Sequence, residues 1–239
     1  MSSDANFMTA DGNLEAAKAE TKAAEQQPPA EQETSSLRIV LTLSVAGLLA
    51  GVLLIFVHQA TQPAILAHKA KMLRLAVEEV LQSPASYDTL YLVDEKLHKE
   101  LPAGGLEKDF EKVFLGKSAD GRSVGFAVVH NRAGFQDQIK VIFGYDPRTK
   151  KMLGMKVLES KETPGLGDKI EKDLDFVEMF TRTQAPLVGV KTGAGSGDVH
   201  EIDMITGATI SSKAVIRIIN EAYEHWHPTL QAYLAEVGS

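Results

Sequence analysis

The sequence predicts an α+β protein with a single N-terminal transmembrane helix, followed by a domain of antiparallel strands flanked by helices. Two observations lead to this fold class. Residues 39–57 contain no charged side chain, and three later strand patterns, two of them joined by a turn, precede two helical patterns. Strands that form a hairpin and are followed by helices are typical of an α+β domain, and they argue against a doubly wound parallel sheet.

The composition excludes several classes of function. The 239 residues carry a net charge of −7, and −5 of it lies in residues 1–36, where seven acids face two bases. No basic surface is available to neutralise phosphates, so we expect no nucleic-acid partner. The chain contains no cysteine, which excludes thiolate-bound iron–sulfur clusters and dithiol chemistry. Electron transfer would therefore require an organic cofactor, or a metal held by histidines or carboxylates.

The N-terminal part divides into a polar tail and an apolar helix. Residues 1–36 are rich in Ala, Glu, Gln, Ser and Thr, and we expect a disordered acidic tail. The charge-free run that follows spans roughly 28 Å as a helix, which matches a hydrocarbon core of about 30 Å. We therefore place a transmembrane helix in the lipid bilayer at residues 37–58. Lys69, Lys71 and Arg74 weakly favour a cytoplasmic C-terminal domain, but the rule holds for short loops only, so the charges leave the orientation open.

The helix is followed by a connecting segment and a domain. Residues 59–86 show amphipathic helical spacing, with Pro63 suited to the first turn of a new helix. The main domain is placed at residues 87–228, and a C-terminal tail at 229–239. Residues 88–121 are polar and irregular, and we predict no strand there.

Three strands and two helices are predicted in the rest of the domain. The strands are expected at Ser123–His130, Gln138–Tyr145 and Met152–Leu158, and the turn residues at 146–150 predict a hairpin between the last two. Helices are expected at residues 169–181 and 212–225. The side chains expected to face the core are Ile170, Leu174, Val177 and Phe180 in the first helix and Val215, Ile216, Ile219, Ala222, Tyr223 and Trp226 in the second.

Common catalytic motifs are absent from the sequence. It contains no GxxxxGK[ST], HExxH or GxSxG pattern, and the glycine-rich residues 193–197 lack the third glycine of a dinucleotide fingerprint, so we interpret them as a turn. His225 and His227 are two residues apart and point to different sides of a helix, which disfavours a metal site. We therefore assign no catalytic residue and no metal ligand, and expect no complete active site within this chain.

Two segments carry more polar and glycine residues than a simple turn needs. Residues 161–168 follow a predicted strand, and their two glycines leave the backbone open to a planar ligand, although a strand-to-helix turn is the better explanation of this segment taken alone. Residues 203–212 place four hydroxyls just before a helix. Helix N-termini attract phosphate, but a single cap residue would also account for part of this pattern.

Both segments resemble those of one family. The pattern Asp203-x-x-Thr206-Gly207-Ala208-Thr209-x-Ser211 resembles the flavinylation motif of FMN-binding domains, and residues 162–167 resemble the flavin loop of the same domains. With the N-terminal anchor, the resemblance extends over residues 37–225. It is strongest to the G subunit of the Rnf ion-translocating electron-transport complex, whose sister family is the C subunit of the sodium-translocating NADH:quinone reductase. Residues 210–215 are more similar to the Rnf member.

The resemblance implies that the domain at 87–228 binds FMN. It also implies a role for each residue that matches the motifs. Thr209 would carry FMN through a phosphoester bond, which a separate Mg-dependent flavin transferase makes from FAD. Gly207 and Ala208 would leave room for the phosphate, and Asp203, Thr206 and Ser211 would serve recognition or positioning. The residues that would line the flavin are Glu162, Thr163, Gly165, Leu166 and Gly167.

The resemblance also implies a place and a function. The chain would relay electrons between other membrane and peripheral subunits of a ferredoxin:NAD complex. Its domain would lie on the outer, periplasmic face of a bacterial cytoplasmic membrane. Two alternatives stay open: the equivalent FMN subunit of the sodium-translocating NADH:quinone reductase, and a membrane-anchored structural or sensory domain without flavin, in which residues 206–209 only cap a helix.

Overall fold

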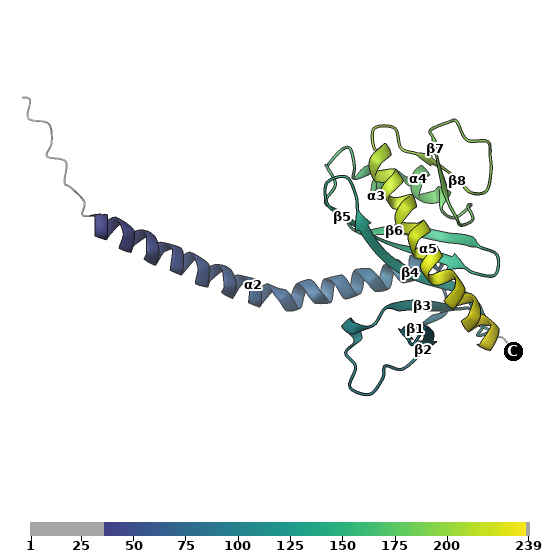
Figure 1. The fold of residues 1–239 in the computed structure, drawn as a ribbon, viewed down its shortest axis with the longest axis horizontal. Coiled ribbons are helices and arrows are strands. Elements are labelled where there is room, and N and C mark those ends of the chain that lie inside the picture. Colours follow the sequence, from purple (N-terminus) through teal and green to yellow (C-terminus); the bar gives the residue numbers. More distant parts are fainter. Residues whose placement is uncertain (1–35, 238–239) are drawn as a thin grey trace, which may run out of the picture. The chain divides into compact units, whose positions relative to one another are not determined.

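The structure, a computed structural model, describes residues 36–237 (Figure 1). The expected disordered tail therefore lies outside the described residues, except for Ser36. The helices are α2 (Ser36–Val80), α3 (Lys169–Lys172), α4 (Leu174–Met179) and α5 (Thr209–Val237), with a 3-10 turn at Glu107–Asp109. The strands are β1 (Ser86–Val93), β2 (Lys96–His98), β3 (Lys112–Lys117), β4 (Ser123–Ala133), β5 (Gln138–Asp146), β6 (Lys151–Glu159), β7 (Val188–Lys191) and β8 (Glu201–Met204).

Six strands form an antiparallel sheet in the order β2-β1-β3-β4-β5-β6. The three predicted strands are confirmed as β4, β5 and β6, with ends that differ by at most three residues, and β5 and β6 form the predicted hairpin. The α+β class with antiparallel strands and flanking helices is also confirmed. A second, two-stranded sheet pairs β7 with β8 in parallel, and it was not expected from the sequence.

The prediction that residues 88–121 contain no strand is wrong, because β1, β2 and β3 lie in or overlap this stretch. For β1 and β3 the reason is that the burial of their residues does not alternate. In β3 four successive residues, 113–116, are buried, since both faces of the sheet are covered. In β1 only Leu90 is fully buried, so neither strand shows the period of two that predicts a half-buried strand.

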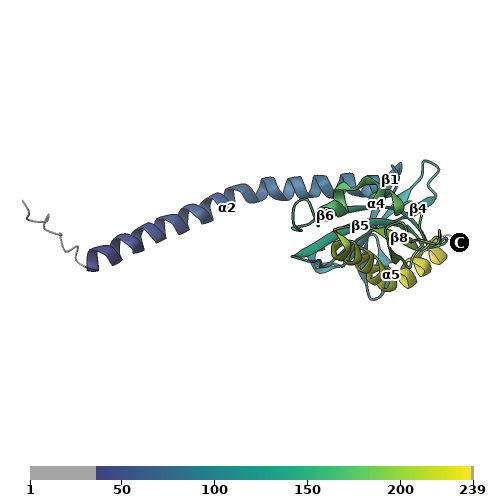
Figure 2. The same ribbon diagram turned by 90° about the horizontal axis from the view of Figure 1, so that it is seen from above.

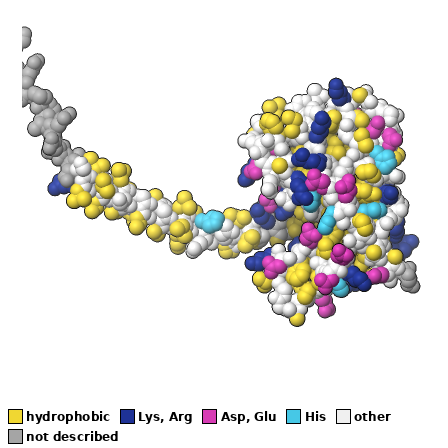
Figure 3. Space-filling model, viewed as in Figure 1, with side chains coloured by type: hydrophobic (Ala, Val, Ile, Leu, Met, Phe, Trp, Pro, Cys, Tyr) yellow, Lys and Arg dark blue, Asp and Glu magenta, His cyan; other side chains and the backbone are white. Residues whose placement is uncertain are grey.

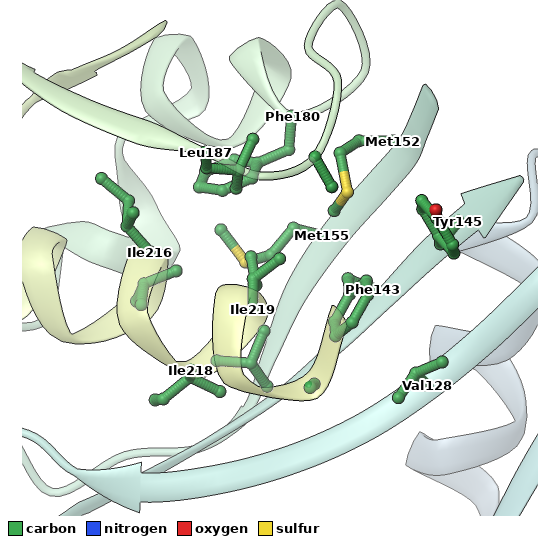
Figure 4. Packing of buried hydrophobic residues seen from close by; sticks show 14 of the residues in the cluster. Val128, Phe143, Tyr145, Met152, Met155, Phe180, Leu187, Ile216, Ile218 and Ile219 are labelled. Carbon is green, nitrogen blue, oxygen red and sulfur yellow. The ribbon is translucent and has the colours of Figure 1, made fainter. Parts of the chain in front are cut away.

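Helices cover both faces of the sheet. One face packs on α5, and the buried side chains of this cluster include Phe143, Met155 and Ile219 (Figure 4). The other face packs on the end of α2, where Val77 and Val80 contact a cluster with Ile142. Figure 2 shows the sheet between these two helical layers. This three-layer packing holds the strand ends and the start of α5 in place, and the site described below is built there.

The first helix differs from the predicted pair of helices. A transmembrane helix at 37–58 and a connecting helix at 59–86 were expected, but α2 is continuous and contains Pro63 in its interior. Proline removes one backbone hydrogen bond, and here the remaining bonds continue the helix across it. The helix ends at Val80 rather than 86. Leu66, an apolar residue of the amphipathic spacing at 59–86, is 61% exposed, because the residues of α2 that are buried begin at Ala76.

The N-terminal part of α2 is apolar on all sides. Among residues 36–237 it is the one helix long and apolar enough to cross a membrane, and none of its most apolar window is buried. Figure 3 shows hydrophobic side chains along this part of the helix. An exposed helix of this kind is unstable in water and stable in lipid.

The later helices differ from the predictions in two places. The helix expected at 169–181 is divided, because the Asp173 carboxylate accepts a hydrogen bond from Phe176 N (3.1 Å) and caps a new helix. Phe176 is therefore buried, whereas Leu174, which was expected inside, is 77% exposed. The last helix continues to Val237 and buries Leu230 and Tyr233, so the expected tail at 229–239 belongs to the core as far as these residues.

Candidate flavin-binding site

The two segments singled out from the sequence line one cavity. It has a volume of about 340 Å³ and lies between the loop after β6 and the start of α5. The predicted residues that line it are Glu162, Thr163, Leu166, Gly167, Gly207, Ala208, Thr209 and Ser211, and two further residues, Phe135 and Ile210, complete the lining. Folding therefore brings together segments that are about 40 residues apart in the chain.

Tight turns place both segments. Gly165 and Gly207 have φ angles of 78° and 83°, a left-handed conformation that L side chains rarely adopt. Ala208 N donates to Ile205 O (3.0 Å), which closes the turn between β8 and α5. The buried Ser212 hydroxyl accepts from Ile205 N (3.2 Å) and donates to Ala208 O (3.0 Å), and so it ties this turn to the helix.

Thr209 is the first residue of α5 and is exposed. Its hydroxyl makes one long hydrogen bond, to Ile205 O at 3.5 Å. Among residues 36–237 no carboxylate or imidazole accepts its proton. A threonine hydroxyl without a base is a weak nucleophile. The residue is therefore accessible for modification, but its activation has to come from outside this part of the chain.

The surroundings of Thr209 fit an anion. The first N–H groups of a helix lack intrahelical acceptors, and the helix dipole favours negative charge there. Lys169 Nζ lies 4.0 Å from the position that a Cβ on Gly207 would take. Lys169 belongs to none of the ion pairs in residues 36–237, whereas its neighbour Lys172 pairs with Asp168 at 2.5 Å. The ammonium group of Lys169 is thus available to a phosphate.

The walls of the cavity fit an apolar ring system. Phe135, Leu166 and Ile210 are 65%, 53% and 56% exposed, although each is a large apolar side chain. Exposed apolar side chains that gather around a pocket are typical of ligand-binding and interaction sites. A planar aromatic ligand with a phosphate would therefore find both an apolar wall and an anion site here.

Glu162 is a buried carboxylate that connects three segments. Its Oε2 accepts from Ser211 Oγ (2.6 Å), and its Oε1 accepts from Phe135 N (2.9 Å) and Gln136 N (3.1 Å). A Cβ at Gly167 would lie 2.7 Å from the Glu162 side chain, so only glycine leaves room for it. Burial by itself would raise the pKa of Glu162, but the hydrogen bonds from Ser211 and from the backbone amides of Gln136 and Phe135 lower it below its usual value. The carboxylate is therefore ionised at neutral pH.

The remaining predicted residues lie apart from the cavity. The Asp203 side chain, on β8, accepts from Gly193 N (3.4 Å) and lines a separate hollow beside the loop at residues 193–199. Thr206 Oγ1 lies 3.0 Å from Thr192 Oγ1, at the outside of the turn. Gly165 shapes the loop but does not line the cavity.

Sequence reasoning did not single out Phe135, Ile210 or Lys169. An aromatic residue within the polar turn after β4 was the available signal for Phe135, but a single residue of this kind is too weak to indicate a site. Lys169 and Gly207 lie close together only because two loops pack against each other, and no sequence pattern predicts this proximity.

Comparison with known proteins shows that the part of the chain that forms the cavity matches a known domain family. Residues 134–224 match the FMN-binding domain, and every residue that lines the cavity falls in this range. The chain is 26% identical over 193 residues to the G subunit of the ion-translocating oxidoreductase complex of Methanosarcina acetivorans, covering 79% of this chain and 93% of that protein. It is 35% identical over 152 residues to the G subunit of the Na(+)-translocating ferredoxin:NAD(+) oxidoreductase complex of Acetobacterium woodii, covering 61% of this chain and 70% of the relative. The chain belongs to the G-subunit family of ion-translocating oxidoreductase complexes.

The fold of this G-subunit family member has a neighbour among solved structures. It is similar to Shewanella oneidensis NqrC with a TM-score of 0.59 and 20% sequence identity, over 70% of this chain and 99% of that one. At this identity the likeness concerns the fold. The antiparallel sheet and its helical layers are therefore shared between the two proteins.

Proposed function

We propose that this chain is a membrane-anchored flavoprotein subunit that relays electrons through FMN within an ion-translocating oxidoreductase complex. FMN is bound covalently, through a phosphoester to Thr209. The observation that carries this proposal is the position of Thr209. Thr209 is exposed and lines a cavity that has an anion site and apolar walls. This cavity is formed by residues within the range that matches the FMN-binding domain.

Thr209 receives FMN from FAD in a group transfer. Its Oγ attacks the phosphorus on the FMN side of the pyrophosphate, so that an Oγ–P bond forms and the bridging P–O bond breaks. AMP leaves, the hydroxyl proton passes to a base or to solvent, and no electron is transferred. Because no base of the described residues contacts Thr209 Oγ1, a separate Mg-dependent flavin transferase supplies the activation.

The chain's own residues hold the product. Lys169 and the N-terminus of α5 neutralise the phosphodiester charge, and Leu166 and Ile210 offer apolar contacts to the ring system. Thr163 lines the same cavity, and Glu162 fixes the loops around it. When bound, FMN supplies one- and two-electron redox chemistry, and the protein supplies attachment and orientation.

The partners are the other subunits of the complex, and the anchor lies in the lipid bilayer. The relatives support a complex that couples ferredoxin and NAD to ion transport, since the name of the Acetobacterium protein describes that reaction. The cavity belongs to the domain that follows the anchor in the chain. We place this domain on the outer face of the cytoplasmic membrane. A covalent bond retains FMN on a face from which a dissociated cofactor would be lost.

The two alternatives are less well supported. The NqrC structure supports the fold that the alternative would also have, but relatives at least 30% identical, such as those of Salmonella typhi and Acetobacterium woodii, are named as G subunits of ion-translocating or Na(+)-translocating oxidoreductase complexes. A structural or sensory domain without flavin would not account for the apolar residues exposed around Thr209 or for the match to the FMN-binding domain.

The test is flavin fluorescence in a denaturing gel, with and without a flavin transferase. We expect a fluorescent band only when the transferase is present, and its complete loss in Thr209→Ala. Thr149→Ala removes an exposed threonine from the β5–β6 turn, outside the cavity, and serves as the matched control that keeps the band. Fluorescence that persists in Thr209→Ala would contradict the assignment of the site, and a dark band in every lane would contradict the flavin itself.

A further inference from the structure

A groove lies between α2 and the face of the sheet that is turned away from α5, and the proposed function does not use it. Its volume is about 470 Å³, and most of its lining lies outside the residues that match the FMN-binding domain. All of its lining residues belong to the unit that begins at Pro63. We propose that this α2 groove binds an anionic phospholipid of the bilayer that holds the anchor, with the headgroup phosphate on its lysines and an acyl chain on its apolar floor.

The floor of the α2 groove is apolar because α2 packs on the sheet only at its end. The buried residues of α2 begin at Ala76, which belongs to the cluster on this face of the sheet. One turn earlier, Met72 is 42% exposed and Leu73 is only half-buried. Val129 of β4 and Leu158 of β6, both half-buried, complete the floor. Apolar side chains that stay open to solvent in a hollow of this size are typical of a binding site for an apolar group.

The rim of the α2 groove is basic. Three lysines line it: Lys69 of α2, Lys112 of β3 and Lys140 of β5. The lining includes one carboxylate, Glu159, whose Oε1 lies 3.1 Å from Lys69 Nζ and 3.8 Å from Lys140 Nζ. Lys112 pairs with Glu107, which is outside the lining, at 2.5 Å. Exposed ion pairs contribute little to stability, so Lys69 and Lys140, which share one carboxylate, can both bind a phosphate instead.

The chain around the α2 groove favours a bilayer lipid as the occupant. Residues 58–77 follow the apolar run and contain two lysines, one arginine and no acid, and a basic segment next to a membrane helix attracts anionic headgroups. Ten residues separate the run from His68, the first residue of the lining, so at about 3.5 Å per residue the groove lies within roughly 40 Å of the end of the run.

A phospholipid matches both parts of the α2 groove. Its phosphate complements the lysines, and its acyl chain complements the floor of Met72, Leu73, Val129 and Leu158. A free phosphate would leave the floor in water, and an uncharged apolar helix of another protein would leave the lysines without a partner. The lipid is the one of these three occupants that accounts for both observations.

Native mass spectrometry of the full-length chain in detergent tests the site. The probe is phosphatidylglycerol, and it is compared with phosphatidylcholine of the same acyl chains and with glycerol phosphate, which has the charge but no chain. The double variant Lys69→Gln/Lys140→Gln removes the charge from the rim. Lys96→Gln/Lys191→Gln is the matched control, because it removes two exposed lysines that do not line the groove. Lipid bound around the anchor is common to all variants, so the difference between them measures the groove.

We expect the unaltered chain to bind phosphatidylglycerol about tenfold more tightly than phosphatidylcholine and not to bind glycerol phosphate. The preference should disappear in Lys69→Gln/Lys140→Gln and persist in Lys96→Gln/Lys191→Gln. Met72→Gln tests the floor separately. Because Met72 is outside the buried cluster, the fold should tolerate the change, and the affinity for both lipids should fall severalfold.

Equal affinity for the two lipids in the unaltered chain would overturn the proposal, and so would a preference that persists in Lys69→Gln/Lys140→Gln. Binding of glycerol phosphate as tight as that of the lipid would assign the groove to a free anion. A dimer that excludes the lipid would assign the groove to a second copy of the chain. Either result would overturn the proposal. The proposed function is tested independently, because covalent flavin should be present in all of these variants whatever their lipid binding.

Discussion

Glu162 shows how one residue can organise a site without reacting in it. Its carboxylate accepts hydrogen bonds from three donors on two segments, and the residue is only 5% exposed. Hydrogen bonds to a charged group are worth more than neutral ones, and an unpaired buried donor is costly. The arrangement therefore stabilises the cavity only while the carboxylate is ionised.

The contribution of Glu162 to stability should depend on pH. Because the pKa of Glu162 is lowered on folding, its contribution is fully present above the unfolded value of about 4.3 and is lost as the pH falls through the lower folded value. We expect Glu162→Gln to lower the free energy of unfolding by about 2 kcal/mol at pH 7 and by less at pH 3. Urea unfolding at both pH values measures the difference.

The control for this prediction is Glu224→Gln, which changes an exposed glutamate of α5. It should leave the free energy of unfolding near that of the unaltered chain at both pH values. If Glu162→Gln destabilises equally at pH 7 and pH 3, the charge of Glu162 is not what connects the segments.

At the scale of elements, glycines in the sheet leave room for the end of α2 to pack closely against its backbone. Gly116, Gly125, Gly144 and Gly154 lie on the successive strands β3 to β6. At Gly144 a Cβ would overlap Val80 O at the end of α2, and at Gly116 it would lie 2.9 Å from Leu81 Cδ1. The last turn of α2 therefore approaches the backbone of the sheet more closely than side chains on these strands would allow.

Two paired glycines distinguish a clash with α2 from the effect that a glycine-to-alanine change has on the strands themselves. Gly144 lies opposite Gly154 in the β5–β6 hairpin, but a Cβ at Gly154 would be 3.4 Å from the nearest atom, Val80 Cα, which is ordinary contact. We expect Gly144→Ala to destabilise the protein by about 1–3 kcal/mol through overpacking, and Gly154→Ala to change it little. Thermal unfolding in detergent measures both. Similar midpoints for the two variants would mean that α2 shifts freely on the sheet.

At the scale of the whole molecule, the anchor and the flavin domain are separate units of one chain. The division between them falls at Pro63, within α2. The apolar unit requires lipid, whereas the domain has its own core and a site that faces solvent. The function proposed above requires the domain to be on one defined side of the membrane, and the bases near the anchor do not decide which side this is.

The natural absence of cysteine makes this orientation measurable. Ala119→Cys introduces one thiol at an exposed position in the turn between β3 and β4, and Ser3→Cys introduces one on the other side of the anchor. With the domain on the outer face, a membrane-impermeant maleimide should label Ala119→Cys in intact spheroplasts and Ser3→Cys only after lysis. The reverse pattern would place the domain in the cytoplasm, and labelling of both before lysis would indicate damaged membranes.

Much of the fold was predictable in segments where a single local sequence pattern specifies the secondary structure. The 19-residue apolar run, the turn residues at 146–150 and the helical spacing in α5 are local signals, and each predicted the right kind of element, although α2 continues to Val80 and α5 to Val237. Strands β1 and β3 were missed because their burial does not alternate: β3 is buried on both faces, whereas in β1 only Leu90 is fully buried. The division of the helix at Asp173 was missed because a capping residue competes there with helical spacing.

The chemistry of the site follows from the sequence, and its geometry from the tertiary structure. The residues at 162–167 and 203–211 resemble the flavin loop and the flavinylation motif of FMN-binding domains, and this resemblance implied a flavin site because both motifs are contiguous in the chain. Only the folded chain decided that Asp203 lies apart from the cavity, that Lys169 lies beside Gly207 and that Phe135 forms a wall. These relations depend on contacts between segments far apart in sequence, which are set by the packing of α5 and of the loops around the buried charge of Glu162, and no local pattern encodes them.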